Sequence, residues 1–197
     1  MTERTFVPAT TGRLIVKRGG SSILRSAGIP KPVVLVDSRE QRPLPLFASH
    51  PNWIGGEREL ALPTADYSVE GMEEVLALER KGLADLLGCI VSQRSRFLDV
   101  CARLSSFRWK AIIIEASYED LKSPDWGGYG IPAEVHSNSV VGTLDAIEAK
   151  FGIPIIYTSV NRALTTERAA SWLSKHFTYW WLEQNGLGRV LIDEDQL

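Results

Sequence analysis

Two uninterrupted runs of apolar, mostly β-branched residues constrain the fold of this chain most strongly. They are VVLV at residues 33–36 and AIII at residues 111–114, which opens the strand-like segment AIIIEAS (111–117). A strand with one solvent-facing side alternates apolar and polar residues, whereas a continuous apolar run suits a strand that is covered on both faces. Strands of this kind need helices on each side of their sheet. The two runs therefore predict an α/β protein.

Strand-like and helical patterns alternate along the rest of the chain. The strand-like runs are residues 58–69, 73–81 and 153–159, and Gly71 marks a hairpin turn between the first two. Helical patterns begin after Lys81, restart after the polar break at residues 92–95, and recur at residues 139–151 and 165–184. We expect Thr165 or Thr166 to cap the last helix.

This order predicts a central mixed β-sheet that is flanked by helices and forms one domain. The domain is expected to span residues 33–185. A peripheral N-terminal segment (1–32) precedes it, and a short C-terminal tail (186–197) follows it.

Composition excludes several classes of protein. The 197 residues include 22 Lys plus Arg and 24 Asp plus Glu, which gives a net charge of −2. This balance excludes a polybasic, histone-like protein but allows a basic strip beside an acidic pocket. Cys89, Cys101 and three scattered histidines support neither a zinc site nor a disulfide framework. Since the chain has neither a membrane-spanning apolar run nor a secretion signal, we expect an intracellular, cytoplasmic protein with no membrane contact.

A cluster of charged residues at strand ends carries the chemistry. Strand alternation places Glu79 and Lys81 on one face and Arg80 on the other. If a hairpin joins this strand to the preceding one, Asp66 lies opposite Glu79, at a strand spacing of about 4.8 Å. Two carboxylates at that distance repel each other unless a cation lies between them. Oxygen ligands of this type favour a hard divalent ion, Mg²⁺ or Mn²⁺.

Such a site can hydrolyse phosphodiesters. A bound ion polarises the phosphoryl oxygen and activates water, while Lys81 orients the water or offsets charge on the phosphate. The triplet Asp66, Glu79 and Lys81 has a second interpretation, because acidic and basic residues also alternate on ordinary solvated strands.

Three segments, taken in order, carry a family resemblance. They are VDSRE at residues 36–40, ADY at residues 65–67, and ERK at residues 79–81 followed by Asp85. Together they resemble the signature of the XPF-type structure-selective endonucleases, whose nuclease domain belongs to the PD-(D/E)xK, restriction-endonuclease-like superfamily. The resemblance runs from about Val33 to Tyr157 and implies a restriction-endonuclease-like core.

The resemblance also implies roles for individual residues. Asp66 and Glu79 are the expected central metal ligands, with Asp37 and Glu40 as further acids around the ion. Lys81 is the expected catalytic lysine. Arg80 would brace the site or pair with an acid such as Asp85, which is itself either a catalytic residue or a helix-capping charge.

Basic residues concentrate in the same part of the chain. Residues 80–110 contain seven Lys or Arg against two Asp, a local balance of +5. Arg94 and Arg96 flank a predicted helix N-terminus, where free backbone N–H groups also favour phosphate. Arg39 is a third candidate DNA contact, and its alternative role is an internal salt bridge to Glu40 or Asp66. For Arg103 and Arg108 an ordinary solvated surface is an equally good interpretation.

The chain departs from the family pattern in three places. Ala65 stands where the family has glycine. No helix-hairpin-helix module follows the nuclease region, and no helicase region precedes it, which predicts a minimal family member of bacterial or viral origin. The last helix carries two apolar stripes, with Phe177 on one and Trp172 on the other. The stripes fit either a homodimer interface or burial under the N-terminal segment.

We therefore expect a Mg²⁺- or Mn²⁺-dependent DNA endonuclease that acts on branched or otherwise structured DNA in repair or recombination. No nucleotide cofactor is expected. The alternative is an inactive, DNA-binding scaffold subunit with the same fold. A third interpretation, an unrelated α/β domain, would require Asp66 and Glu79 to lie far apart.

Overall fold

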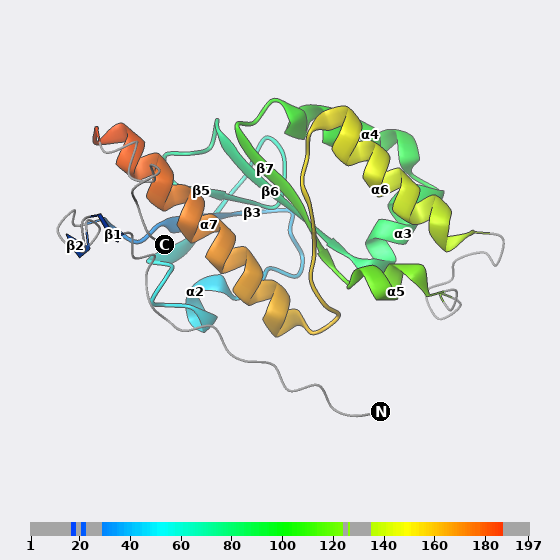
Figure 1. Cartoon of the computed structure of the whole chain (residues 1–197), viewed down its shortest axis with the longest axis horizontal. Helices are drawn as coiled ribbons and strands as arrows, with labels where there is room; N and C mark the ends of the chain where they lie inside the picture. Colours follow the sequence, from blue (N-terminus) through cyan, green and yellow to red (C-terminus); the bar gives the residue numbers. More distant parts are fainter. Residues whose placement is uncertain (1–16, 19–20, 23–28, 124–125, 127–134, 187–197) are drawn as a thin grey trace.

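A six-stranded mixed sheet organises the molecule (Figure 1). The computed structural model describes residues 17–18, 21–22, 29–123, 126 and 135–186. The strand order in the sheet is β4-β3-β5-β6-β7-β8. The strands are β3 (Val33–Asp37), β4 (Gly56–Leu60), β5 (Tyr67–Val69), β6 (Leu76–Gly82), β7 (Trp109–Glu115) and β8 (Ile155–Tyr157). A separate two-stranded ladder pairs β1 (Lys17–Arg18) with β2 (Ser21–Ser22).

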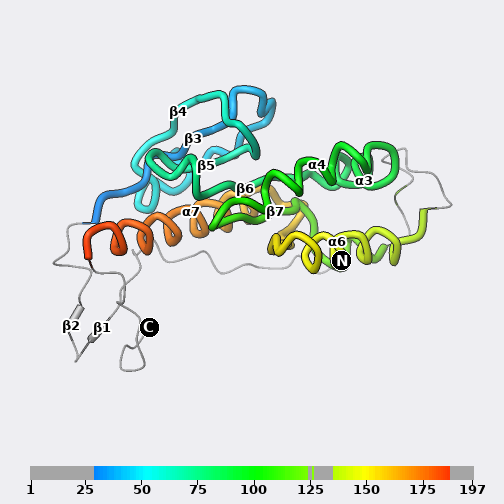
Figure 2. Tube along the Cα trace, turned by 90° about the horizontal axis from the view of Figure 1, so that it is seen from above, coloured from blue at the N-terminus to red at the C-terminus, as the bar shows by residue number. Residues whose placement is uncertain are grey.

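Helices cover both faces of the sheet, as the buried strands predict. The helices are α2 (Leu46–Ser49), α3 (Leu83–Val91), α4 (Arg94–Ser105), α5 (Tyr118–Lys122), α6 (Ser137–Phe151) and α7 (Arg162–Gln184). One apolar core contains buried residues of α2 and α7, and the other contains those of α3, α4 and α6. Both views place α7 at one end of the long axis and α3, α4 and α6 at the other (Figures 1 and 2).

Strand directions explain why charged residues meet at one edge of the sheet. β5 runs antiparallel to both β3 and β6, and β7 runs parallel to β6. The carboxyl ends of β3, β6 and β7 therefore lie at the same edge as the start of β5. These ends carry Asp37, Lys81 and Glu115, and Asp66 directly precedes β5.

Most elements occur where the sequence predicts them, and the sheet is mixed as expected. The prediction of a single strand over residues 58–69 is wrong. This segment contains two strands, β4, which pairs in parallel with β3, and β5, which pairs antiparallel with β3. The predicted cap of the last helix is also wrong. Asn161 caps α7 by accepting a hydrogen bond from the Ala163 amide, whereas Thr165 and Thr166 are buried inside the helix.

The apolar residues of α7 pack largely within the chain. Trp172, Leu173 and Phe177 are buried in the core that α7 shares with α2 and the sheet, and the rings of Trp172 and His176 lie 3.9 Å apart. Contact with the chain's own sheet therefore accounts for much of both stripes. No helix in the described part of the chain is long and apolar enough to span a membrane.

Candidate active site

A pocket of about 480 Å³ opens at the edge where the strand ends meet. β3, β6, α3, α4 and the loop that leads into β5 all contribute to its walls. Its charged lining residues are Asp37, Arg39, Asp66, Glu79, Lys81, Asp85, Arg96 and Arg103. Four carboxylates and four cationic side chains thus converge on one cavity in a chain whose net charge is −2.

Asp66 and Glu79 face each other across the β5–β6 hairpin. Tyr67 pairs with Leu78, so Asp66 and Glu79 occupy the next opposed positions. Burial, followed by repulsion from Glu79, raises the pKa of Asp66 to about 7, although the Arg80 amide donates a 2.7 Å hydrogen bond to Asp66 Oδ2. The two carboxylates therefore form a pair that a cation would stabilise.

Lys81 projects from the same face of β6 as Glu79. Its Nζ donates a 2.6 Å hydrogen bond to Glu79 Oε1, and only 18% of the Lys81 side chain is exposed. Burial opposes the charged amine, but attraction to Glu79 and Asp66 outweighs it and raises the pKa of Lys81. The lysine is therefore held as a cation beside the two acids.

Asp37 is engaged by Arg39. The Arg39 amide and Nε each donate to Asp37 Oδ1 at 2.8 Å, Nη2 donates to Oδ2 at 2.7 Å, and the Leu62 amide also donates to Oδ2. The hydrogen bond from the Arg39 side chain is the main reason that the pKa of Asp37 is lowered. Arg39 thus pairs with Asp37 rather than with Glu40 or Asp66, and its exposed side chain also lines the pocket.

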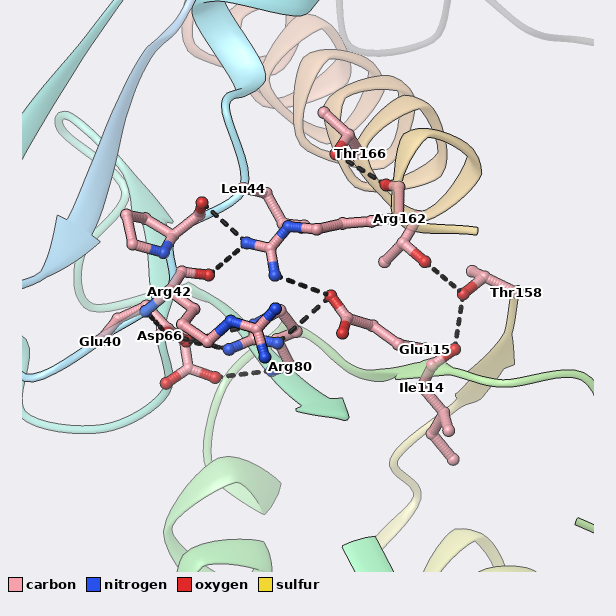
Figure 3. Close-up of polar contacts among 12 residues, drawn as sticks. Glu40, Arg42, Leu44, Asp66, Arg80, Ile114, Glu115, Thr158, Arg162 and Thr166 are labelled. Atoms are coloured by element: carbon pink, nitrogen blue, oxygen red, sulfur yellow. Dashed lines mark hydrogen bonds and ion pairs between the residues drawn. The ribbon is translucent and has the colours of Figure 1, made fainter. Parts of the chain in front are cut away.

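Arg80 points to the opposite side of β6, into a buried ion-pair network (Figure 3). Its guanidinium donates to both oxygens of Glu40 at 2.9–3.2 Å, and its Nη1 lies 3.2 Å from Glu115 Oε1. Burial would raise the pKa of Glu40, but hydrogen bonds from Arg80 and the Arg42 amide lower it. The structure therefore pairs Arg80 with Glu40 and Glu115 rather than with Asp85, and Glu40 is not among the residues that line the pocket.

Arg162 extends this network to the start of α7. Its Nη2 donates to the backbone carbonyls of Arg42 and Pro43, and its Nη1 lies 3.7 Å from Glu115 Oε1 (Figure 3). The loop after β3, the end of β7 and the first turn of α7 are thus connected through charged groups behind the pocket.

The backbone conformation at Ala65 shows why the family signature has a glycine at this position. Its φ is 66°, and within the described residues it is the one non-glycine with a positive φ. This left-handed backbone costs alanine about 1–2 kcal/mol, a penalty that glycine avoids. Because Asp66 follows directly, the turn at Ala65 sets the direction from which that carboxylate enters the pocket.

The donor set fits a hard divalent cation. Mg²⁺ commonly binds through one or two carboxylates, with water and substrate phosphates completing its coordination. Asp66 and Glu79 supply two such carboxylates, and their mutual repulsion favours a cation between them. Among the described residues, no group of three or more His, Cys, Asp or Glu side chains is arranged to hold a metal. The pair is therefore suited to an ion that substrate phosphate helps to bind.

The candidate DNA contacts occupy different positions. Arg39 and Arg96 line the pocket, whereas Arg94 lies outside the lining and donates to Thr143 Oγ1 on α6 at 3.0 Å. Arg103 also lines the pocket, although an ordinary solvated surface was an equally good interpretation of its place in the sequence. Its spacing from Arg96, two full helical turns, was the available signal.

The raised pKa of Asp66 predicts how stability depends on pH. Folding raises this pKa from an ordinary 3.8 to about 7, so the folded protein binds a proton that the unfolded chain releases. This favourable contribution to the free energy of unfolding is fully present below pH 4 and is lost as the pH rises through 7. It totals roughly 4 kcal/mol, of which about 2–3 kcal/mol is lost between pH 5 and pH 8. Metal-free urea unfolding at pH 5 and pH 8 should show this loss, and Asp66→Asn should remove it. A pH dependence that Asp66→Asn leaves unaltered would contradict the assignment.

Comparisons with known proteins identify the family and the fold. The model of the ERCC4 domain matches residues 36–171, whereas no curated protein matches the chain significantly. A solved structure of XPF from Aeropyrum pernix is 20% identical, with a TM-score of 0.55 over 78% of this chain and 73% of that one. XPF from Aeropyrum pernix in complex with DNA is 22% identical, with a TM-score of 0.55 over 75% of this chain and 66% of that one. The matched region contains all the acids and the lysine of the pocket, and the chain therefore belongs to the ERCC4 domain family and has the fold of XPF nucleases.

Proposed function

We propose that the protein is a metal-dependent DNA endonuclease that hydrolyses phosphodiester bonds. The observation that carries the proposal is the pocket, in which Asp66, Glu79 and the Lys81 ammonium converge at the strand edge. Neighbouring carboxylates together with a fixed amine are the groups that metal-assisted phosphodiester hydrolysis requires.

Asp66 and Glu79 would hold Mg²⁺ or Mn²⁺, with Asp37 nearby. The ion supplies charge that polarises the scissile phosphate and lowers the pKa of water. Lys81 would orient the attacking water and offset negative charge on the phosphate. Arg39 and Arg96 would hold the DNA backbone at the mouth of the pocket. Arg80 and Glu40 would support the site from behind, since the Arg80 amide holds Asp66.

The retained charged groups favour an enzyme over a scaffold. An inactive DNA-binding subunit has no need to keep the buried Glu79 carboxylate beside the half-buried Asp66 carboxylate, because their mutual repulsion costs stability. The similarity to XPF from Aeropyrum pernix, which was solved in complex with DNA, supports a nucleic-acid substrate. The proposal includes two further points: the substrate is branched or otherwise structured DNA, and the protein acts in DNA repair or recombination.

The first test is a metal-dependent cleavage assay. Purified protein is incubated with labelled fork, flap, junction and linear DNAs in Mg²⁺, in Mn²⁺ and in EDTA. We expect cleavage in either metal and none in EDTA, and Asp66→Asn should remove cleavage in both metals while leaving the fold unchanged by circular dichroism. A folded protein that binds these DNAs and cuts none of them would instead support the scaffold function.

A homodimer through α7 stays a prediction. Sedimentation of the full chain over a range of concentrations tests it, because a stable dimer would give twice the monomer mass of 21.9 kDa.

A further inference from the structure

One face of α4 forms a wall of the pocket and carries two arginines. The residues of this helix that line the pocket are Arg96, Phe97, Val100 and Arg103. Positions 96, 100 and 103 follow the i, i+4, i+7 spacing of a single helical face. Arg96 and Arg103 therefore point to the same side of the helix.

Both arginines are available to bind an external anion. The two side chains are exposed, and no ion pair in the described part of the chain involves either one. Arg103 Nε donates a single 3.2 Å hydrogen bond to the neutral hydroxyl of Thr64. Other arginines differ, since Arg80 is paired with Glu40 and both terminal nitrogens of Arg108 bond to Glu183 at 2.7 Å.

The geometry relates Arg103 to the proposed reaction centre. Lys81 Nζ lies 6.0 Å from the centre of the Phe97 ring, so the first turn of α4 lies beside the catalytic groups. Arg103 is six residues further along, which is about 9 Å of helix axis. Successive phosphates of one DNA strand rotate about the duplex axis as well as rising along it, so they lie about 7 Å apart and this length corresponds to one or two nucleotides.

We propose that the α4 face follows one strand of the DNA, and that Arg103 binds a backbone phosphate one or two nucleotides from the scissile phosphate. This inference rests on the proposed function and adds to it the path of the substrate strand. Thr64, two residues before Asp66, would hold the Arg103 side chain toward the pocket before DNA binds. The required ligand is therefore a continuous strand that extends at least two nucleotides beyond the cut on one side.

Salt-dependent binding tests the phosphate contact without cleavage. Fluorescence anisotropy of labelled DNA is measured in EDTA at several NaCl concentrations, with every protein carrying Asp66→Asn. Adding Arg103→Ala should weaken binding about five- to tenfold at 0.1 M salt and reduce the slope of log K against log salt by about one. Arg103→Lys should keep most of the slope. Arg108→Ala, which removes an exposed but paired arginine, should leave it unchanged.

Neutral methylphosphonate linkages locate the contact. A single linkage one or two nucleotides from the cut should weaken binding by the Arg103-containing protein, but should have no added effect once Arg103→Ala is present. An unchanged salt slope in Arg103→Ala would overturn the inference while leaving cleavage and the proposed function intact. A reduced slope in a protein that never cuts DNA would support the phosphate contact and count against the enzyme. A protein that binds no DNA would overturn both.

Discussion

Replacing Lys81 with methionine is expected to lower the rate of DNA cleavage by about 10²- to 10⁴-fold. The methionine keeps most of the apolar length of the side chain but removes the ammonium that lies 2.6 Å from Glu79 Oε1. Without this charge, the attacking water loses its orienting group and the phosphate loses a nearby cation. Single-turnover cleavage with saturating protein measures the chemical step apart from DNA binding.

Lys110→Met is the matched control for this substitution. Lys110 lies on the neighbouring strand β7, but its Nζ donates to the backbone carbonyls of Ser105 and Phe107 outside the active-site pocket. We expect its cleavage rate to stay within threefold of the parent rate, since no catalytic group is removed. If Lys81→Met also cuts within that range, Lys81 is not the catalytic lysine.

The elements that the sequence predicted best are those whose buried side chains recur at a regular spacing along the chain. A helix was expected to begin after Lys81, and the apolar residues at helical spacing in α3 are all buried, namely Leu83, Leu86, Leu87 and Ile90. The hairpin around Gly71 was also predicted correctly, and Gly71 has a φ of 82°. Local periodicity reports which side chains are buried, so it is sufficient for such elements.

Apart from the hairpin around Gly71, the sequence did not predict which strands pair with one another, because strand pairing depends on tertiary contacts and not on the local pattern of apolar residues. The pattern of residues 58–69 predicted one strand. In the structure β4 is the edge strand and lies parallel to β3, while β5 pairs with the opposite side of β3. The connecting loop includes Pro63 and the left-handed Ala65, and these residues reverse the chain between the two strands.

The same distinction applies to the site. Strand alternation and hairpin register together were enough to bring Asp66, Glu79 and Lys81 to one place. The pairing of Glu40 with Arg80 could not be inferred, because it depends on how the loop after β3 folds behind β6. The position of Arg103 depended similarly on the angle at which α4 crosses the pocket.

Replacing Arg80 with methionine is expected to destabilise the fold by about 3–5 kcal/mol. The Arg80 side chain is 8% exposed, and it neutralises Glu40 and Glu115, whose side chains are 6% and 16% exposed. Removing the guanidinium leaves two carboxylates close together with little access to water. Urea unfolding at pH 7 measures the loss, and Arg58→Met, which breaks the exposed Arg58–Glu70 pair, should cost less than about 1 kcal/mol.

A triple substitution separates two causes of the loss: the charges of Glu40 and Glu115, which among the described residues keep only the more distant Arg162 nearby, and the lost packing of the Arg80 side chain. If the two buried carboxylates cause the loss, adding Glu40→Gln and Glu115→Gln to Arg80→Met should restore most of the stability, because neutral amides are far cheaper to bury than charges. A loss below 1 kcal/mol in Arg80→Met, or no recovery in the triple variant, would contradict this explanation. Since the Arg80 amide stays in place to hold Asp66, the triple variant should still bind Mg²⁺. The ion pairs behind β6 would then stabilise the end of the strand, while the carboxylates on its other face bind the metal.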